Sequence, residues 1–276
     1  MTIEECLNNA IRKLLNSSSP KCDAEVLLSF VMNKSKSFLM SYYDKVLSLE
    51  EEIRFSNLLQ RRLKGEPIAY LTGIQEFWSL PLTVNPSVLI PRPDSEILIE
   101  EVLIKSNKCH LNILDLGTGC GALALAIARS RPNWNILGVD IFKKAIRTAI
   151  YNSKKLKINN VHFVQSNWFS KIPCYTFDFI ISNPPYLSSK EVRLFRKNIK
   201  YEPLSSFLSG NQGFKDIYYI ICNSRKYLRK QGWLFIEHGW KQKRIVQKLF
   251  KENNFSYVYS RKDYAKNDRV TAGKIC

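Results

Sequence analysis

The stretch ILDLGTGCGA, residues 113–122, decides the fold of this chain. Its apolar beginning, Ile113-Leu114-Asp115-Leu116, predicts a buried strand, and the residues from Ala122 to Arg129 predict a helix. Glycine lets the backbone turn sharply and approach a ligand closely, so the residues between strand and helix predict a binding loop. The loop consists of Gly117, Thr118, Gly119, Cys120 and Gly121.

Two features indicate what this loop binds. Asp140 ends the next expected strand, 19 residues after Gly121, and an acid at that place can accept hydrogen bonds from ribose hydroxyls. It could also simply cap the following helix. The glycines are spaced G-x-G-x-G and not G-x-G-x-x-G, the pattern of dinucleotide-binding loops. The spacing therefore favours S-adenosylmethionine over NAD, because S-adenosylmethionine has no pyrophosphate to place at the helix start.

Strands and helices alternate from residue 96 onward. We expect strands at 113–116, 136–139, 161–164, 177–182 and 233–236, helices at 122–129, 143–155, 217–228 and 242–250, and closing strands at 257–259 and 269–271. This alternation predicts an α/β domain with a mostly parallel, doubly wound sheet.

The first 73 residues predict a small helical bundle. Three amphipathic helices are expected, at 4–15, from a cap at Asp23 to Val31, and at 49–63 with a stop at Gly65. Residues 74–95 predict a β-hairpin linker, because β-prone runs at 76–84 and 88–90 flank Asn85-Pro86-Ser87. Asp94 or Ser95 is expected to cap the next helix, which starts at Glu96. The predicted domains are thus 1–73, 74–95 and 96–276.

The tetrapeptide Asn183-Pro184-Pro185-Tyr186 indicates the chemistry. It follows the apolar run 179–182, so it lies at the carboxyl end of a strand, where open α/β sheets bind ligands. The prolines stiffen the loop and exclude Asn183 from the helical region. A proline-rich turn with a capping Asn is the structural alternative, and it does not account for the aromatic residue that follows.

Methylation of a planar NH2 group is difficult because its nitrogen lone pair is delocalised. A site can promote it by accepting hydrogen bonds from both N–H groups, which orients the nitrogen for in-line attack. Asn183 Oδ1 and a backbone carbonyl near Pro184 could accept these bonds, and Tyr186 could pack on the planar group. No catalytic Cys, His or metal is needed.

With these residues the chain resembles the HemK/PrmC family of release-factor-specific protein-(glutamine-N5) methyltransferases. The matching segments span nearly the whole sequence: 65–73, 76–78, 89–96, 117–121, 183–186, 201–204 and 237–240. The segments around Arg92 and Glu237-His238-Gly239 are more specific than Asn-Pro-Pro-Tyr, which nucleic-acid amino-methyltransferases share.

The resemblance implies a Rossmann-like class I S-adenosylmethionine-dependent methyltransferase domain. It implies that residues 117–121, Asp140 and Asn183 bind the cofactor, with Trp168 near the adenine, and that S-adenosylhomocysteine is the product. It implies that Asn183, Pro184, Pro185 and Tyr186 bind the substrate, the glutamine in the Gly-Gly-Gln loop of class I peptide-chain release factors. The amino-terminal bundle would help to grip the release factor. Asn167, Asn211-Gln212-Gly213 and Ala265 depart from the family pattern, away from the substrate loop.

Two other hypotheses remain open at this point. A nucleic-acid amino-methyltransferase, acting on adenine N6 or guanine N2, would share the tetrapeptide and suit a basic chain. It usually needs a sizeable target-recognition domain, and no insertion here exceeds a loop. A cofactor-binding module without chemistry would not need an intact Asn-Pro-Pro-Tyr.

Charge is the unusual feature of the composition, with a formal net charge of +18. Residues 1–75 hold ten basic and nine acidic side chains, so nearly all of the excess lies later in the chain. We favour compositional drift over a nucleic-acid partner, with attraction to an acidic release-factor surface as the alternative. Seven scattered cysteines, the absence of a CxxC pair or zinc-site pattern, and the absence of a signal peptide or membrane span predict a cytoplasmic protein without metal.

Overall fold

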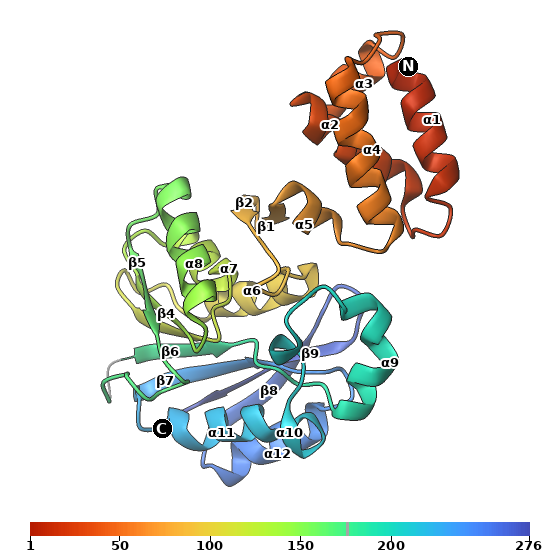
Figure 1. The fold of residues 1–276 in the computed structure, drawn as a ribbon. Helices are drawn as coiled ribbons and strands as arrows, with labels where there is room; N and C mark the ends of the chain where they lie inside the picture. Colours follow the sequence, from red (N-terminus) through yellow and green to blue (C-terminus); the bar gives the residue numbers. More distant parts are fainter. Residues whose placement is uncertain (175–176) are drawn as a thin grey trace. The chain divides into compact units, whose positions relative to one another are not determined.

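The chain is described by a computed structural model that covers residues 1–174 and 177–276 (Figure 1). Its contacts divide it into two compact units, Met1–Ile74 and Gln75–Cys276. The segment 74–95, predicted as a linker, is therefore not separate: residue 74 belongs to the first unit and residues 75–95 to the second.

The first unit contains five described helices: α1 (Ile3–Lys13), α2 (Pro20–Met32), α3 (Lys36–Ser41), α4 (Leu49–Leu63) and α5 (Ile68–Thr72). Their apolar faces enclose a core that includes Ile3, Leu27, Leu28 and Phe55. The side chains of Thr2 and Ser48 each form a capping box, which satisfies free backbone N–H groups at the start of α1 and α4. The expected helices are confirmed, and α3 and α5 were not predicted.

Asp23 does not cap the second helix, so that prediction is wrong. The helix begins at Pro20, whose fixed φ suits a first helical position. The buried Asp23 carboxylate accepts hydrogen bonds from Ser17 Oγ at 2.6 Å, from Ser19 Oγ at 3.2 Å and from Arg62 Nε at 2.9 Å. It therefore links α2 to α4.

The second unit is built on a seven-stranded sheet in the described residues, ordered β5-β4-β3-β6-β7-β9-β8. The strands are β3 (Asn112–Leu116), β4 (Asn135–Asp140), β5 (Val161–Gln165), β6 (Phe177–Ser182), β7 (Leu228–Glu237), β8 (Ser256–Lys262) and β9 (Asp268–Lys274). The first five in the order pair in parallel, and β9 is antiparallel to both of its neighbours. The predicted mostly parallel α/β sheet is confirmed.

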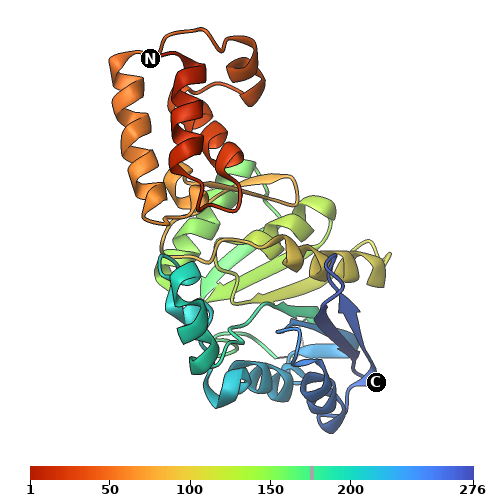
Figure 2. The same cartoon turned by 90° about the vertical axis from the view of Figure 1, so that its right-hand side faces the viewer.

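Helices cover both faces of this sheet, as Figures 1 and 2 show. One face carries α6 (Glu96–Lys105), α7 (Ala122–Ser130) and α8 (Lys143–Leu156), and the other carries α11 (Lys215–Ser224) and α12 (Lys243–Glu252). The parallel strands are buried on both sides, which explains their continuous apolar runs. The expected helix at 217–228 ends earlier, at Ser224, and the exposed helix α9 (Ser189–Ile199) was not predicted.

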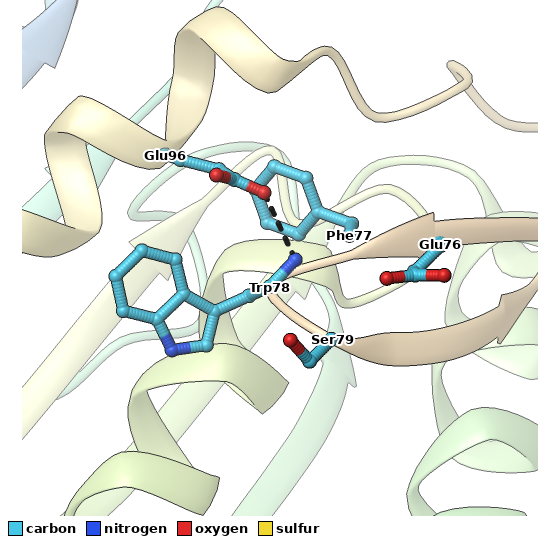
Figure 3. A pocket seen from close by; sticks show the side chains of 5 residues that line it. All are labelled: Glu76, Phe77, Trp78, Ser79 and Glu96. Atoms are coloured by element: carbon cyan, nitrogen blue, oxygen red, sulfur yellow. Dashed lines mark hydrogen bonds between the residues drawn. The ribbon is translucent and has the colours of Figure 1, made fainter.

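The β-hairpin lies earlier than expected. It consists of β1 (Ile74–Phe77) and β2 (Leu80–Thr83), and it turns at Trp78 and Ser79, whose φ values are 51° and 57°. The chain does turn at 85–88, where the Val88 N–H donates to the Asn85 carbonyl at 3.1 Å. This turn joins no hairpin, so the predicted hairpin position and the strand expected at 88–90 are wrong. A pocket of about 490 Å³ lies beside the turn (Figure 3), where the Trp78 backbone N–H donates to Glu96 Oε1 at 3.0 Å. Trp78 Nε1 donates to Ser130 Oγ at 3.0 Å, so the turn is bonded to α6 and α7.

Candidate active site

A cavity of about 680 Å³ opens at the carboxyl ends of β3, β4 and β6. The strand order reverses at β3, which lies between β4 and β6, and open α/β sheets bind ligands at such a point. Its volume is within the range of small-molecule sites, roughly 300–1,000 Å³. The lining includes the following predicted site residues: Gly117, Gly119, Asp140, Trp168, Asn183 and Pro185.

The glycine loop reaches the cavity through two of its five residues, Gly117 and Gly119. Thr118 Oγ1 donates instead to the buried Asp115 Oδ2 at 2.6 Å. Cys120 is buried, and burial raises the pKa of its thiol to about 12, so it remains protonated at neutral pH. Gly121 has a φ of +87°, and a Cβ there would lie tightly, at 3.0–3.2 Å, against three side chains. Thr118, Cys120 and Gly121 therefore do not line the cavity and contribute to the conformation of the loop.

Asp140 lies at the end of β4 and lines the cavity. Its Oδ2 accepts a hydrogen bond from the Gly119 N–H at 3.0 Å, and its Oδ1 accepts one from the Phe142 N–H at 2.9 Å. Burial raises the pKa of this carboxyl, and these backbone donors oppose the shift. Asp140 therefore accepts a hydrogen bond from the residue just before α8, as a capping side chain would. It also fixes the position of Gly119 in the cavity wall.

The lining fits a nucleoside-containing cofactor. Trp168 lies against the loop, where a Cβ on Gly117 would be 3.5 Å from its ring, so an aromatic face is available to a base. A Cβ on Gly119 would meet no protein atom within 4 Å, so the backbone is open to close approach. Behind the loop, Asp115 Oδ1 is buried and has no hydrogen-bond partner among the described residues.

Asn183 and Pro185 line the cavity directly after β6, whereas Pro184 and Tyr186 do not. Asn183 Nδ2 donates to Ser95 Oγ at 3.0 Å. In residues 1–174 and 177–276 no donor is bonded to Asn183 Oδ1, which leaves an acceptor at the cavity wall. Tyr186 OH donates to Glu237 Oε1 at 3.4 Å, so its ring is held from behind.

Residues that motif analysis alone did not assign also meet at this loop. Ser95 occupies the N-cap position of α6, which starts at Glu96 as predicted, but its side chain makes no capping hydrogen bond, and neither does that of Asp94. Ser95 Oγ donates to the buried Glu237 Oε2 at 2.6 Å. Glu202 is paired with Arg92, and its Oε2 accepts the Ile90 N–H at 3.0 Å, next to the cavity-lining Leu89. The signal that could have found them was the set of specific segments around 92, 202 and 237.

Models of known protein families match most of the chain. The PrmC N-terminal domain matches residues 5–73, and a methyltransferase domain matches residues 107–271. The release factor glutamine methyltransferase of Buchnera aphidicola subsp. Acyrthosiphon pisum (strain APS) is 48% identical over 275 residues, covering 99% of each chain. That of Escherichia coli (strain K12) is 42% identical over 274 residues, again covering 99% of each chain.

This chain belongs to the release factor glutamine methyltransferase family. The resemblance noted from the sequence is therefore confirmed, as is its assignment as a methyltransferase. Among solved structures, the hMettl16 catalytic domain in complex with the MAT2A 3′UTR hairpin 6 matches with a TM-score of 0.62 at 14% identity, covering 87% of this chain and 92% of that one. A methyltransferase from Pyrococcus furiosus matches with a TM-score of 0.55 at 19% identity, covering 79% and 98%. These two show the fold.

The three departures from the family pattern lie at different distances from the site. Asn167 lines the cavity, and its N–H donates to Ser170 Oγ at 3.2 Å. Asn211 and Gln212 adopt left-handed φ values of 50° and 55° in the short α10 (Gly210–Gly213), whose first residue lines the cavity. The expectation that this segment lies away from the substrate loop is wrong, because Gly213 packs against the Tyr186 carbonyl. Ala265 lies in the β8–β9 turn. In the described residues no helix is long and apolar enough to cross a membrane, and no group of three His, Cys, Asp or Glu is placed to hold a metal.

Proposed function

We propose that this protein transfers a methyl group from S-adenosylmethionine to the side-chain amide nitrogen (N5) of the glutamine in the Gly-Gly-Gln motif of class I peptide-chain release factors. Membership of the release factor glutamine methyltransferase family, at 42–48% identity over almost the full length, carries the proposal. The cavity geometry is consistent with it, because the chemistry needs an acceptor and not a nucleophile. Modification of release factors would modulate translation termination, and we expect it to take place in the cytoplasm.

S-adenosylmethionine, when bound, would supply a methyl group on a sulfonium centre; as the nitrogen takes the methyl, the C–S bond would break to give S-adenosylhomocysteine, and the methylated amide would release one N–H proton to water. We assign its binding to the residues of the cavity wall: Asp140 for the ribose hydroxyls, Trp168 for the adenine, and the Gly117–Gly119 backbone for the methionine end. Asp140 would need only its free lone pairs, since each carboxylate oxygen can accept more than one hydrogen bond.

Asn183 orients the glutamine amide in this proposal. Its Oδ1 accepts one N–H of the substrate, and the backbone carbonyl near Pro184 accepts the other. Both bonds strengthen as the amide nitrogen gains positive charge, so they favour the transition state over the flat ground state. Pro184 and Pro185 keep the loop stiff, and Tyr186 supports it from the Glu237 side.

Residues 1–73 are proposed to grip the release factor. This unit exposes apolar side chains that its own core does not use, among them Met40, Tyr43 and Val46, which are 72%, 56% and 63% exposed. Exposed apolar groups that gather on a small domain are typical of protein-binding surfaces. Direct binding of nucleic acid is not part of the proposal.

One assay tests this function. Labelled S-adenosylmethionine is offered with a release factor, with the same factor carrying Gln→Ala in its Gly-Gly-Gln motif, and with DNA or ribosomal RNA. We expect label on the unchanged release factor alone. Label on nucleic acid, with none on the release factor, would support the amino-methyltransferase alternative and refute the proposal.

A further inference from the structure

Ser95 and Glu237 come from segments far apart in the sequence and meet behind Asn183. Ser95 ends the short helix η1 (Pro93–Ser95), and Glu237 ends β7. The Ser95 hydroxyl donates to Glu237 Oε2 at 2.6 Å and accepts the Asn183 Nδ2–H at 3.0 Å. Ser95 is 4% exposed and Glu237 is 2% exposed, and neither lines the cavity.

The carboxylate fixes the direction of this chain of hydrogen bonds. An ionised carboxylate can only accept, so it takes the single hydroxyl proton of Ser95. The Ser95 oxygen is then left to Asn183 as an acceptor, and only the NH2 side of the amide can meet it. The amide oxygen of Asn183 therefore remains free at the cavity.

The hydrogen bonds can run in the opposite direction when Glu237 is protonated. A carboxylic acid can donate to Ser95, whose hydroxyl can then donate to the Asn183 amide oxygen. The amide would turn by half a rotation and present NH2 at the cavity. An NH2 group cannot accept an N–H from the substrate glutamine.

We infer that Ser95 and Glu237 are positioning residues, which hold the Asn183 amide with its oxygen toward the substrate nitrogen. This inference rests on the proposed function. Asn183 remains the group that touches the substrate, and the other two act through it. The role accounts for the Glu237 segment and for the serine after Arg92-Pro93-Asp94, to which the reaction itself assigns no task.

The groups that face Glu237 come from three elements: Asp94 and Ser95 from η1, Tyr186 from the loop after β6, and Arg269 from β9. Burial raises the pKa of Glu237 to about 7, and Asp94 adds to the shift. The hydrogen bond from Ser95 and the charge of Arg269 oppose it. The two directions of hydrogen bonding therefore interchange in a pH range where the enzyme can be assayed.

The first test measures kcat and KM at saturating cofactor for Ser95→Ala, Ser95→Thr and Glu237→Gln. Displacing a reacting group can cost about 100-fold, so we expect kcat of Ser95→Ala to fall by about 10- to 100-fold while the KM for the release factor changes little. Ser95→Thr keeps the hydroxyl and should restore most of kcat. Ser224→Ala removes another buried serine hydroxyl, which donates within α11 to the Ile221 carbonyl at 3.1 Å, and serves as the control.

The pH profile supplies a readout that a purely structural role would not move. With a pKa of about 7, ionised Glu237 increases about tenfold from pH 6 to pH 8, so wild-type kcat should rise by about that factor. Glu237→Gln cannot titrate, so its kcat should be flat over the same range. Ser95→Ala with kcat within twofold of wild type, or Glu237→Gln with the wild-type profile, would overturn the inference.

A measurement without substrate separates this inference from the proposed function. The side-chain amide signals of Asn183 in a 15N-labelled enzyme are assigned by their absence in Asn183→Asp. They should shift with pH around 7 in the wild type and not in Glu237→Gln. A wild type that methylates no release factor would refute the function, whereas Asn183 signals insensitive to pH would refute the positioning role.

Discussion

Gly119 and Gly121 lie two residues apart in the same loop, and the structure predicts different consequences for their replacement by alanine. Both have positive φ, +57° and +87°, so each alanine pays for a left-handed backbone, about 1–2 kcal/mol. A Cβ on Gly119 would meet no protein atom within 4 Å. A Cβ on Gly121 would lie 3.0 Å from Phe163 Cζ, 3.1 Å from Leu125 Cδ1 and 3.2 Å from Ala149 Cβ.

These distances set the expected magnitudes. Overpacking adds about 1–3 kcal/mol to the backbone cost at residue 121, so Gly121→Ala should lower the free energy of unfolding by about 2–5 kcal/mol. Gly119→Ala should lower it by only about 1–2 kcal/mol. At residue 119 the new methyl group enters the cavity, so the same steric cost falls on the cofactor and should weaken its Kd by roughly 5- to 150-fold.

The assay follows from the position of the tryptophans. All five, at 78, 134, 168, 233 and 240, belong to the second unit, so urea unfolding followed by tryptophan fluorescence reports on that unit alone. Calorimetric titration with S-adenosylhomocysteine gives the affinity of each variant. If Gly121→Ala cost no more stability than Gly119→Ala, the packing argument would be refuted. If Gly119→Ala bound S-adenosylhomocysteine with unchanged affinity, the assignment of this loop to the cofactor site would be refuted.

Three further outcomes are expected. Asn183→Ala should lower kcat by about 100- to 1,000-fold, in the range measured for single oxyanion-hole groups, while calorimetry finds the Kd for S-adenosylhomocysteine within about threefold of wild type; near-normal turnover would disprove the orientation mechanism. Burial raises the pKa of Asp115 to about 7, so between pH 5 and pH 7 this carboxyl is protonated in the folded chain and ionised in the unfolded chain. The free energy of unfolding should therefore fall by about 2 kcal/mol from this group as the pH rises from 5 to 7. Asp115→Asn should lose that slope in urea unfolding at the two pH values, and an unchanged slope would contradict it. If the basic surface attracts release factors, kcat/KM for the release factor should fall steeply as the salt concentration rises from about 50 to about 300 mM, because salt screens exposed charges. The rate of single-turnover methyl transfer at saturation should stay constant.

The sequence predicted the parts of the fold that depend on local pattern. The run 113–122 has a buried strand, a glycine turn and a helix in order, and the structure has β3, the loop and α7 there. The hairpin was misplaced because its turn uses left-handed φ at Trp78 and Ser79, which are residues without the usual glycine or asparagine signal. Asp23 was taken for a cap because an acid near a helix start is ambiguous until its long-range partner, Arg62, is known.

The site was predictable to the extent that it is contiguous in sequence. Asn183 could be singled out because two prolines follow it at a strand end. The segments of Ser95 and Glu237 could be noted as specific, but not their contact with Asn183, since the two residues are 142 positions apart and become neighbours only when β7 and η1 pack together. The loop after β3 shows the same limit, because periodicity cannot tell that Thr118 turns inward to Asp115 while Gly119 lines the cavity.

We do not expect the net charge to select the substrate, and the distribution of charge gives the reason. Six basic side chains of the acid-free stretch 141–177 are exposed and line no part of the cavity: Lys143, Lys144, Arg147, Lys154, Lys155 and Lys157. Around the cavity, Lys215 is the basic lining residue of the described chain, beside the acids Asp140 and Asp216. A phosphate backbone would gain little from such a wall, whereas a neutral amide needs only a correctly oriented acceptor, so we expect the orientation of Asn183 to matter more for the choice of substrate than the +18 charge.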